Sequence, residues 1–178
     1  MTVATPLMRM PVGIIVERRK AKSPWIDHVW RPLSALAGRP ETAPWTPLDV
    51  SDDVATFYAG GADVELFRSE TTFYRENLAS GAPMLWVVLR PTGIEPPYEL
   101  VAVTANPSEG EAMAGPGTDL VETVAMPDPI RDDIAAFVAE HHVEQVFYKR
   151  KRDKVDPHGR RAPADRRGGD ARTGEDEQ

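Results

Sequence analysis

The chain of 178 residues contains no cysteine. This absence excludes a disulfide framework, a thiol nucleophile, Cys-ligated zinc and Cys-held iron–sulfur clusters, and we expect no cofactor. Long apolar stretches are also missing, because the longest run, residues 84–89, is far shorter than the roughly 20 residues of a membrane-spanning helix. The N-terminus lacks the apolar stretch of a signal peptide. We therefore expect a cytoplasmic protein with no membrane contact.

Positive charge is scarce in the middle of the chain. The formal net charge is −7. Residues 40–148 carry nineteen acidic but only four basic side chains, whereas residues 1–39 carry seven basic and two acidic ones. Residues 149–178 are basic again, with ten basic and seven acidic side chains. An acidic body repels phosphate backbones, so we expect a protein partner and restrict any nucleic-acid contact to residues 147–154.

The domain organisation follows from the length and from the spacing of the prolines. A chain of this length suits one domain with a single core, and fifteen of the 17 prolines precede residue 149 and separate many short elements. We predict a single α+β domain at residues 11–148, with a largely antiparallel sheet built from hairpins, two short helices and a C-terminal amphipathic helix. Residues 1–10 are expected to be a flexible N-terminus. Residues 149–178 are expected to be a basic run and a disordered tail, which has almost nothing apolar to bury.

Hydrophobic periodicity predicts the strands. Alternation favours strands at residues 12–18 and 25–31, and apolar runs favour strands at 84–90 and 98–104, with an edge strand at 119–125. Residues 38–47 hold three prolines and are expected to form a loop. Gly60-Gly61 lies between two apolar-patterned runs, and we expect a tight hairpin turn there.

Capping residues and 3.6-residue periodicity predict the helices. We expect a helix at residues 70–79 capped by Ser69, and a short helix through Met113 that begins at Asn106-Pro107. The last helix follows Asp128 and has one apolar face, formed by Ile130, Ile134, Phe137, Val138 and His141.

Five stretches carry a resemblance to a known family. They are PVGIIVERR (11–19), PWIDHVWRPLSAL (24–36), VELFRSETTFYRENL (64–78), MLWVVLR (84–90) and IAAFVAEHHVEQVFYKRKR (134–152). As an ordered set they resemble a proteobacterial family catalogued as domain of unknown function 3305. Members tend to be encoded beside molybdenum-dependent formate dehydrogenases and their assembly chaperones. The resemblance therefore implies an accessory role and supplies no catalytic residues.

The histidines offer little for metal binding or catalysis. His141 and His142 are the nearest candidates for metal ligands, but adjacent helical residues point about 100° apart, and the i, i+4 spacing of zinc-protease helices is missing. We expect His141 at the edge of the apolar face and His142 in solvent. In a strand, Asp27 and His28 would point to opposite faces and could not form an acid–base pair. We therefore predict no catalytic residues and no metal site.

Aromatic and basic residues are the candidates for partner binding. On a strand, Trp25 and Trp30 would lie on opposite faces, so that one of them is exposed and, with Arg31, anchors a partner. Near the C-terminus, five of the six residues 149–154 are basic and follow two aromatic residues. These charges either complement a helix end or bind an acidic protein surface, RNA or the ribosome. The candidate residues of this second segment are Phe147, Tyr148, Lys149, Arg150, Lys151 and Arg152.

Three functions remain open at this level. The leading hypothesis is a non-enzymatic accessory protein that binds a protein partner, a subunit or assembly factor of a molybdenum-dependent formate dehydrogenase. The second is an RNA- or ribosome-associated module that uses the C-terminal basic run. The third is an enzyme with a histidine and carboxylate site that no motif reveals.

Overall fold

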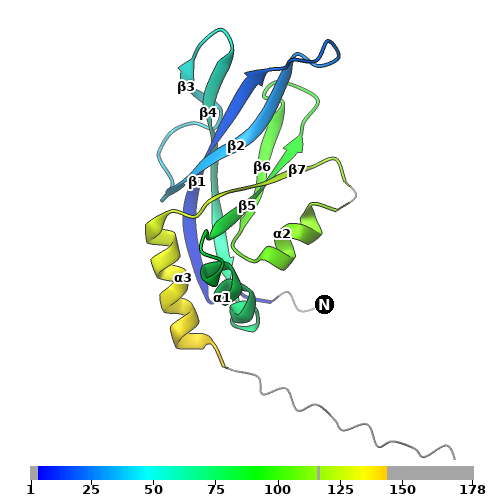
Figure 1. Cartoon of the computed structure of the whole chain (residues 1–178). Coiled ribbons are helices and arrows are strands. Elements are labelled where there is room, and N and C mark those ends of the chain that lie inside the picture. Colours follow the sequence, from blue (N-terminus) through cyan, green and yellow to red (C-terminus); the bar gives the residue numbers. More distant parts are fainter. Residues whose placement is uncertain (1–3, 116, 144–178) are drawn as a thin grey trace, which may run out of the picture. The chain divides into compact units, whose positions relative to one another are not determined.

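The computed structural model describes residues 4–115 and 117–143, all of which belong to one compact unit, Met1–Glu144. This unit holds two antiparallel sheets and three α-helices (Figure 1). The fold is therefore a mixed α+β domain, as the sequence predicts.

The larger sheet has four strands in the order β2-β1-β4-β3, and each neighbouring pair is antiparallel. The strands are β1 (Met8–Lys20), β2 (His28–Ala37), β3 (Thr46–Val50) and β4 (Val54–Leu66). Alternate residues of β1, namely Val12, Ile14 and Val16, are completely buried. The predicted alternation of the first strand thus builds the inner face of this sheet.

The smaller sheet has three strands in the order β6-β5-β7. They are β5 (Met84–Pro91), β6 (Tyr98–Thr104) and β7 (Leu120–Ala125), so the strand expected at residues 119–125 does lie at an edge. The two sheets approach each other where β4 lies beside β6 and where β2 lies beside β7. The core lies between the sheets.

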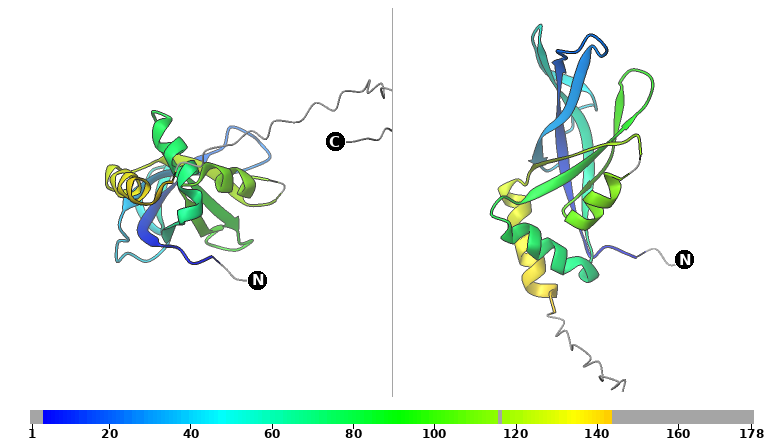
Figure 2. Two further views of the ribbon diagram at one scale, coloured as in Figure 1. Left: turned by 90° about the horizontal axis from the view of Figure 1, so that it is seen from below. Right: turned by 45° about the vertical axis from the view of Figure 1, so that its right-hand side comes forward.

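Three α-helices complete the domain: α1 (Thr71–Ala79), α2 (Pro107–Met113) and α3 (Asp128–His141). A single 3₁₀ turn, η1 (Arg68–Glu70), precedes α1. Helices α1 and α3 pack together at one end of the sheets (Figures 1 and 2). The predicted apolar face of α3 is confirmed, because its buried residues are Ile130, Ile134, Phe137 and Val138.

Helix α2 begins as its sequence predicts. Asn106 is the N-cap, its side chain accepts hydrogen bonds from the backbone N–H groups of Ser108 and Glu109, and Pro107 is the first helical residue. By contrast, Ser69 does not cap α1. The chain forms η1 first, and neither η1 nor α1 has a side-chain cap.

The hairpin expected at Gly60-Gly61 is wrong. Strand β4 runs without interruption through both glycines and pairs with β1 on either side of them. The register shifts between Ile14 and Ile15 at this point, and Gly60 has φ +127°. The sequence suggested a turn because glycine adopts positive φ readily. In the structure, the positive φ of Gly60 instead accompanies a β-bulge-like irregularity, which bends a strand without reversing its direction.

Other boundaries also differ from the prediction. The N-terminus is ordered earlier than expected, because β1 begins at Met8 and pairs with the end of β4, and Met10 is buried. The last two residues of the loop expected at 38–47 belong to β3 (Thr46–Val50). This strand was not predicted, because it contains Pro47 and follows a proline-rich segment. The strand expected at residues 25–31 begins only at His28, because Trp25 lies in the preceding turn.

Candidate functional site

Two chain connections meet at the end of the sheets away from α1 and α3 (Figures 1 and 2). They are the β1–β2 turn (residues 21–27) and the β5–β6 loop (residues 92–97). A cleft of about 650 Å³ lies between them and is called the Trp25 cleft here. Its lining residues are Trp25, Ile26, Asp27, His28, Trp30, Pro91, Gly93, Ile94, Glu95, Pro97 and Tyr98.

The rim of the Trp25 cleft is apolar and exposed. Trp25 is 91% exposed, Ile94 is 73% exposed and Ile26 is 53% exposed. Scattered exposed apolar residues are ordinary on protein surfaces, whereas an exposed apolar cluster marks an interaction site. These three side chains come from two connections that are far apart in the sequence, and all three line one cleft.

The floor of the cleft belongs to an aromatic cluster. The ring of Trp30 lies 6.0 Å from Trp45, 5.6 Å from Phe57 and 6.1 Å from Tyr98, measured between centroids. The guanidinium of Arg18 lies 5.7 Å from the centroid of Trp30, within cation–π range. Trp30 is half-buried. Its contacts with the three rings and with Arg18 fix its position beside Tyr98.

Hydrogen bonds between hydroxyl side chains and the backbone, and one bond between backbone groups, hold the two connections. In the β5–β6 loop, the Thr92 hydroxyl lies 2.8 Å from the carbonyl oxygen of Ile94 and 2.5 Å from that of Pro96. The Thr92 N–H also donates to the carbonyl oxygen of Pro97 (3.0 Å). In the β1–β2 turn, the Trp25 N–H donates to the Ser23 hydroxyl (3.2 Å). The cleft is therefore largely pre-formed.

The charged side chains that line the Trp25 cleft are carboxylates. Asp27 comes from the turn and Glu95 from the loop, and the lining contains no lysine or arginine. Neither carboxylate forms an ion pair with any residue in the described part of the chain. Both remain available to a positively charged ligand.

Arg31, the third residue expected near the tryptophans, lies elsewhere. Strand alternation puts it on the opposite face from Trp30, where its Nε donates to Glu17 Oε1 (2.9 Å). Arg19 donates to the same oxygen (2.6 Å). The hydrogen bond from Arg19, assisted by Arg31, outweighs burial and lowers the pKa of the Glu17 carboxyl. The structure thus brings Trp25 and Trp30 to one cleft, and the opposite faces expected for them are wrong because Trp25 lies in a turn and not on the strand. Arg31 instead forms a half-exposed ion pair with the buried Glu17.

His141 and His142 both contact neighbouring side chains. His141 packs on Phe137 with ring centroids 4.6 Å apart, as expected at the edge of the apolar face. The solvent position expected for His142 is wrong. Its Nδ1 lies 3.1 Å from the Thr71 hydroxyl at the start of α1, and its Nε2 is buried without a hydrogen-bond partner among residues 4–115 and 117–143. Within those same residues, no group of three or more His, Asp or Glu side chains is placed to hold a metal ion.

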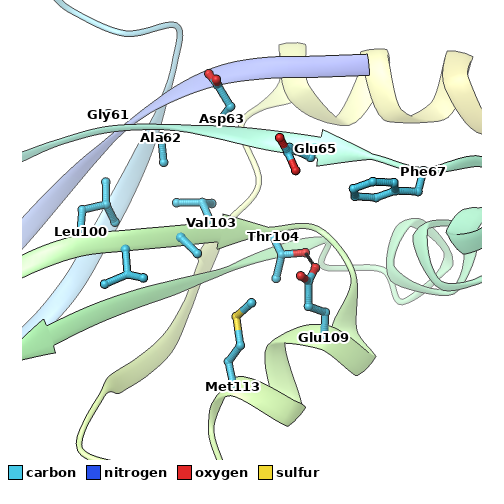
Figure 3. Close-up of a pocket in the computed structure, with 12 residues that line it drawn as sticks. Gly61, Ala62, Asp63, Glu65, Phe67, Leu100, Val103, Thr104, Glu109 and Met113 are labelled. Carbon is cyan, nitrogen blue, oxygen red and sulfur yellow. Dashed lines mark hydrogen bonds between the residues drawn. The ribbon is translucent and has the colours of Figure 1, made fainter. Parts of the chain in front are cut away.

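A second hollow, of about 430 Å³, lies between β4 and β6 and is lined by Asp63, Glu65 and Glu109 among others (Figure 3). Its three carboxylates are already engaged: Asp63 with Arg39 (3.0 Å), Glu65 with Arg9 (2.9 Å) and Glu109 with the Thr104 hydroxyl (2.6 Å). The three carboxylates of this hollow therefore already have partners, whereas Asp27 and Glu95 of the Trp25 cleft have no ion-pair partner among the described residues.

Two predictions concern residues outside the described part of the chain. Phe147, Tyr148 and the basic residues from Lys149 to Arg152 lie outside the described residues, as does the expected disordered tail. In the part of the chain that is described, no helix has the length and the hydropathy needed to cross a membrane.

Sequence reasoning missed the β5–β6 half of the cleft. Ile94 belongs to a short Gly- and Pro-containing loop, where a large aliphatic side chain has no core to enter. A large aliphatic residue in such a loop is the sequence signal that could have indicated a binding surface there. Nothing in the sequence places it beside Trp25.

Comparison with known proteins adds a family. The family model described as "Protein of unknown function (DUF3305)" matches residues 11–151. This range includes all three helices and all the strands, apart from the first three residues of β1. No curated protein and no solved structure matches the chain. On the strength of the family match, the chain belongs to the DUF3305 family.

Proposed function

We propose that this protein is a non-enzymatic accessory protein and that the Trp25 cleft is the surface on which it binds a protein partner. The observation that carries the proposal is the 91% exposure of Trp25 beside exposed Ile94 and Ile26. Tryptophan is enriched among the few interface residues that dominate binding energy.

The magnitude is large enough for an anchor. An aromatic side chain buries about 150–250 Å², which corresponds to about 4–6 kcal/mol at 25 cal/mol per Å². Part of this gain is offset by the loss of freedom on association. A net effect of about 2 kcal/mol or more for removal of the indole is the expectation for such a residue.

The proposed partner is a subunit or assembly factor of a molybdenum-dependent formate dehydrogenase. This choice rests on the family resemblance described above, which implies an accessory role beside such enzymes and their assembly chaperones. The acidic character of residues 40–148 favours a partner with a basic surface.

The test is co-purification of the full chain with the formate dehydrogenase and the assembly factors encoded in the same genome, followed by affinity measurement with purified components. Trp25→Ala is expected to weaken binding by about 30-fold or more, which is about 2 kcal/mol. Phe73→Ala is the matched control, because Phe73 is a partly exposed aromatic residue on α1, at the other end of the domain. Equal binding by the wild type and Trp25→Ala would refute the docking surface. Absence of binding to any of these proteins would refute the choice of partner.

A further inference from the structure

We infer that the Trp25 cleft accepts an extended, proline-rich segment of the partner, in polyproline II conformation, with an arginine or lysine next to the prolines. This inference rests on the proposed function and deepens it, since it names the chemistry of the segment that docks.

The lining suits proline. Three aromatic side chains, Trp25, Trp30 and Tyr98, face the same cleft as Pro91 and Pro97. Aromatic-lined grooves are the recurring receptors for polyproline II segments, whose flat rings pack against indole and phenol faces. Such a segment has three residues per turn and leaves its carbonyl groups without internal hydrogen bonds. An exposed indole N–H such as that of Trp25 is a suitable donor to one of them.

Charge complementarity selects the flanking residue. Asp27 comes from the β1–β2 turn and Glu95 from the β5–β6 loop, and neither carboxylate has an ion-pair partner among residues 4–115 and 117–143. The lining of the cleft contains no lysine or arginine. An arginine or lysine beside the prolines is attracted, and an acidic residue at the same place is repelled.

Rigidity on both sides lowers the cost of binding. The hydrogen bonds of Thr92 hold the β5–β6 loop, and the ring contacts of Trp30 hold the floor. A polyproline II segment is itself ordered before it binds. Little conformational entropy is therefore lost on either side, which allows a short segment to bind a small, open cleft.

The experiment measures binding of three fluorescein-labelled peptides to the full chain by fluorescence anisotropy. The first peptide has six prolines and one flanking arginine, the second has alanines in place of the prolines, and the third has glutamate in place of the arginine. We expect the first to bind at least about 10-fold more tightly than the second, since the alanine chain must be ordered on binding. We also expect the arginine peptide to bind at least about 3-fold more tightly than the glutamate peptide, and this difference in affinity should decrease with added salt.

Variants assign the binding to the cleft. Trp25→Ala is expected to weaken the proline–arginine peptide by about 10-fold or more, and Phe73→Ala is expected to leave it unchanged. The double variant Asp27→Asn, Glu95→Gln is expected to bind the arginine and glutamate peptides equally while it keeps the preference for proline over alanine. Circular dichroism and the thermal midpoint verify that each variant is folded.

Several results would overturn the inference. The first is equal binding of the proline and alanine peptides. The second is that none of the three peptides binds at concentrations up to about 1 mM, which corresponds to very weak affinity. The third is that Trp25→Ala leaves the affinity for the proline–arginine peptide unchanged. A concentration-dependent dimer that Trp25→Ala dissociates would show a second copy of the chain in the cleft and would also overturn it. If the partner still requires Trp25 but no proline-rich peptide binds, the inference fails and the proposed function stands. If the peptide binds through Trp25 but the formate dehydrogenase subunits and assembly factors do not, the choice of partner in the proposed function fails, and the preference of the cleft for a proline-rich segment with an arginine stands.

Discussion

Replacement of Glu17 by glutamine tests how the larger sheet is stabilised. Glu17 is 5% exposed, and its carboxylate accepts hydrogen bonds from Arg19 (2.6 Å) and Arg31 (2.9 Å). Glutamine keeps the shape and one acceptor oxygen but removes the negative charge between the two guanidinium groups. The variant therefore isolates the electrostatic part of the interaction.

The expected loss of stability lies between the contribution of a buried ion pair and that of an exposed one. Hydrogen bonds to charged groups contribute about 1.5–3 kcal/mol each when buried, and exposed ion pairs contribute about 0–1 kcal/mol. Both arginine side chains are about half exposed, so solvent screens their side of the pair. We expect Glu17→Gln to lower the free energy of unfolding by about 1–3 kcal/mol in total, and each 1 kcal/mol lowers the thermal midpoint by about 2–4 °C in a chain of this size.

The loss must also depend on pH in one direction. The hydrogen bond from Arg19 lowers the pKa of Glu17 in the folded protein, whereas in the unfolded chain a glutamate titrates near pH 4.3. The stabilisation is therefore complete above about pH 4.3 and is lost as the pH falls through the lowered pKa. The difference between the wild type and Glu17→Gln should be constant at neutral pH and should shrink in acid.

Urea denaturation at a series of pH values measures this difference. Glu65→Gln is the matched control, because Glu65 of β4 pairs with Arg9 of β1 in the same sheet, and both of these side chains are more than 40% exposed. We expect Glu65→Gln to cost about 0–1 kcal/mol. The reasoning is refuted if both variants lose the same stability, or if the Glu17→Gln deficit persists unchanged at low pH.

Three further predictions concern packing and the C-terminal segment. Gly110→Ala should destabilise the protein by about 2–3 kcal/mol in urea denaturation, as overpacked substitutions do, because the new Cβ would lie 2.1 Å from Cγ of Trp86; a loss below about 0.5 kcal/mol would show that the ring moves aside at little cost. A chain that ends after Arg152 should keep its thermal midpoint, because the removed residues have little apolar surface to bury; a drop of more than a few degrees would show that they pack. The double variant Lys149→Glu, Lys151→Glu should weaken partner binding in a salt-dependent way if the basic run contacts an acidic surface or RNA, and binding that neither salt nor the variant alters would remove this run from the functional account.

Elements with strong local signals could be predicted from the sequence. The cap at Asn106 and the proline after it place α2 correctly, and the apolar periodicity of residues 130–138 places α3 and its buried face. The alternation of Val12, Ile14 and Val16 identifies the buried face of β1. In each case neighbouring residues alone determine the conformation or the burial pattern.

Gly60 shows where local signals become ambiguous. Positive φ at a glycine serves a tight turn and a strand irregularity equally well, and pairing with β1 decides between them. The prediction that His142 faces solvent is wrong for a similar reason. Helical periodicity indicates which side of a helix faces the core, but only the packing of α1 against α3 brings Thr71 to this ring.

The candidate site divides in the same way. The sequence by itself determined that the protein has no thiol chemistry, that its body is acidic, and that Trp25 and Trp30 are candidates for a partner surface. Only the tertiary structure decided that Trp25 is the exposed tryptophan, that Arg31 is engaged by Glu17, and that Ile94 and Tyr98 complete a cleft with the two tryptophans. The physical reason is that the cleft is made by two connections from different sheets, and their proximity depends on how the sheets pack over the shared core, which no local sequence pattern encodes.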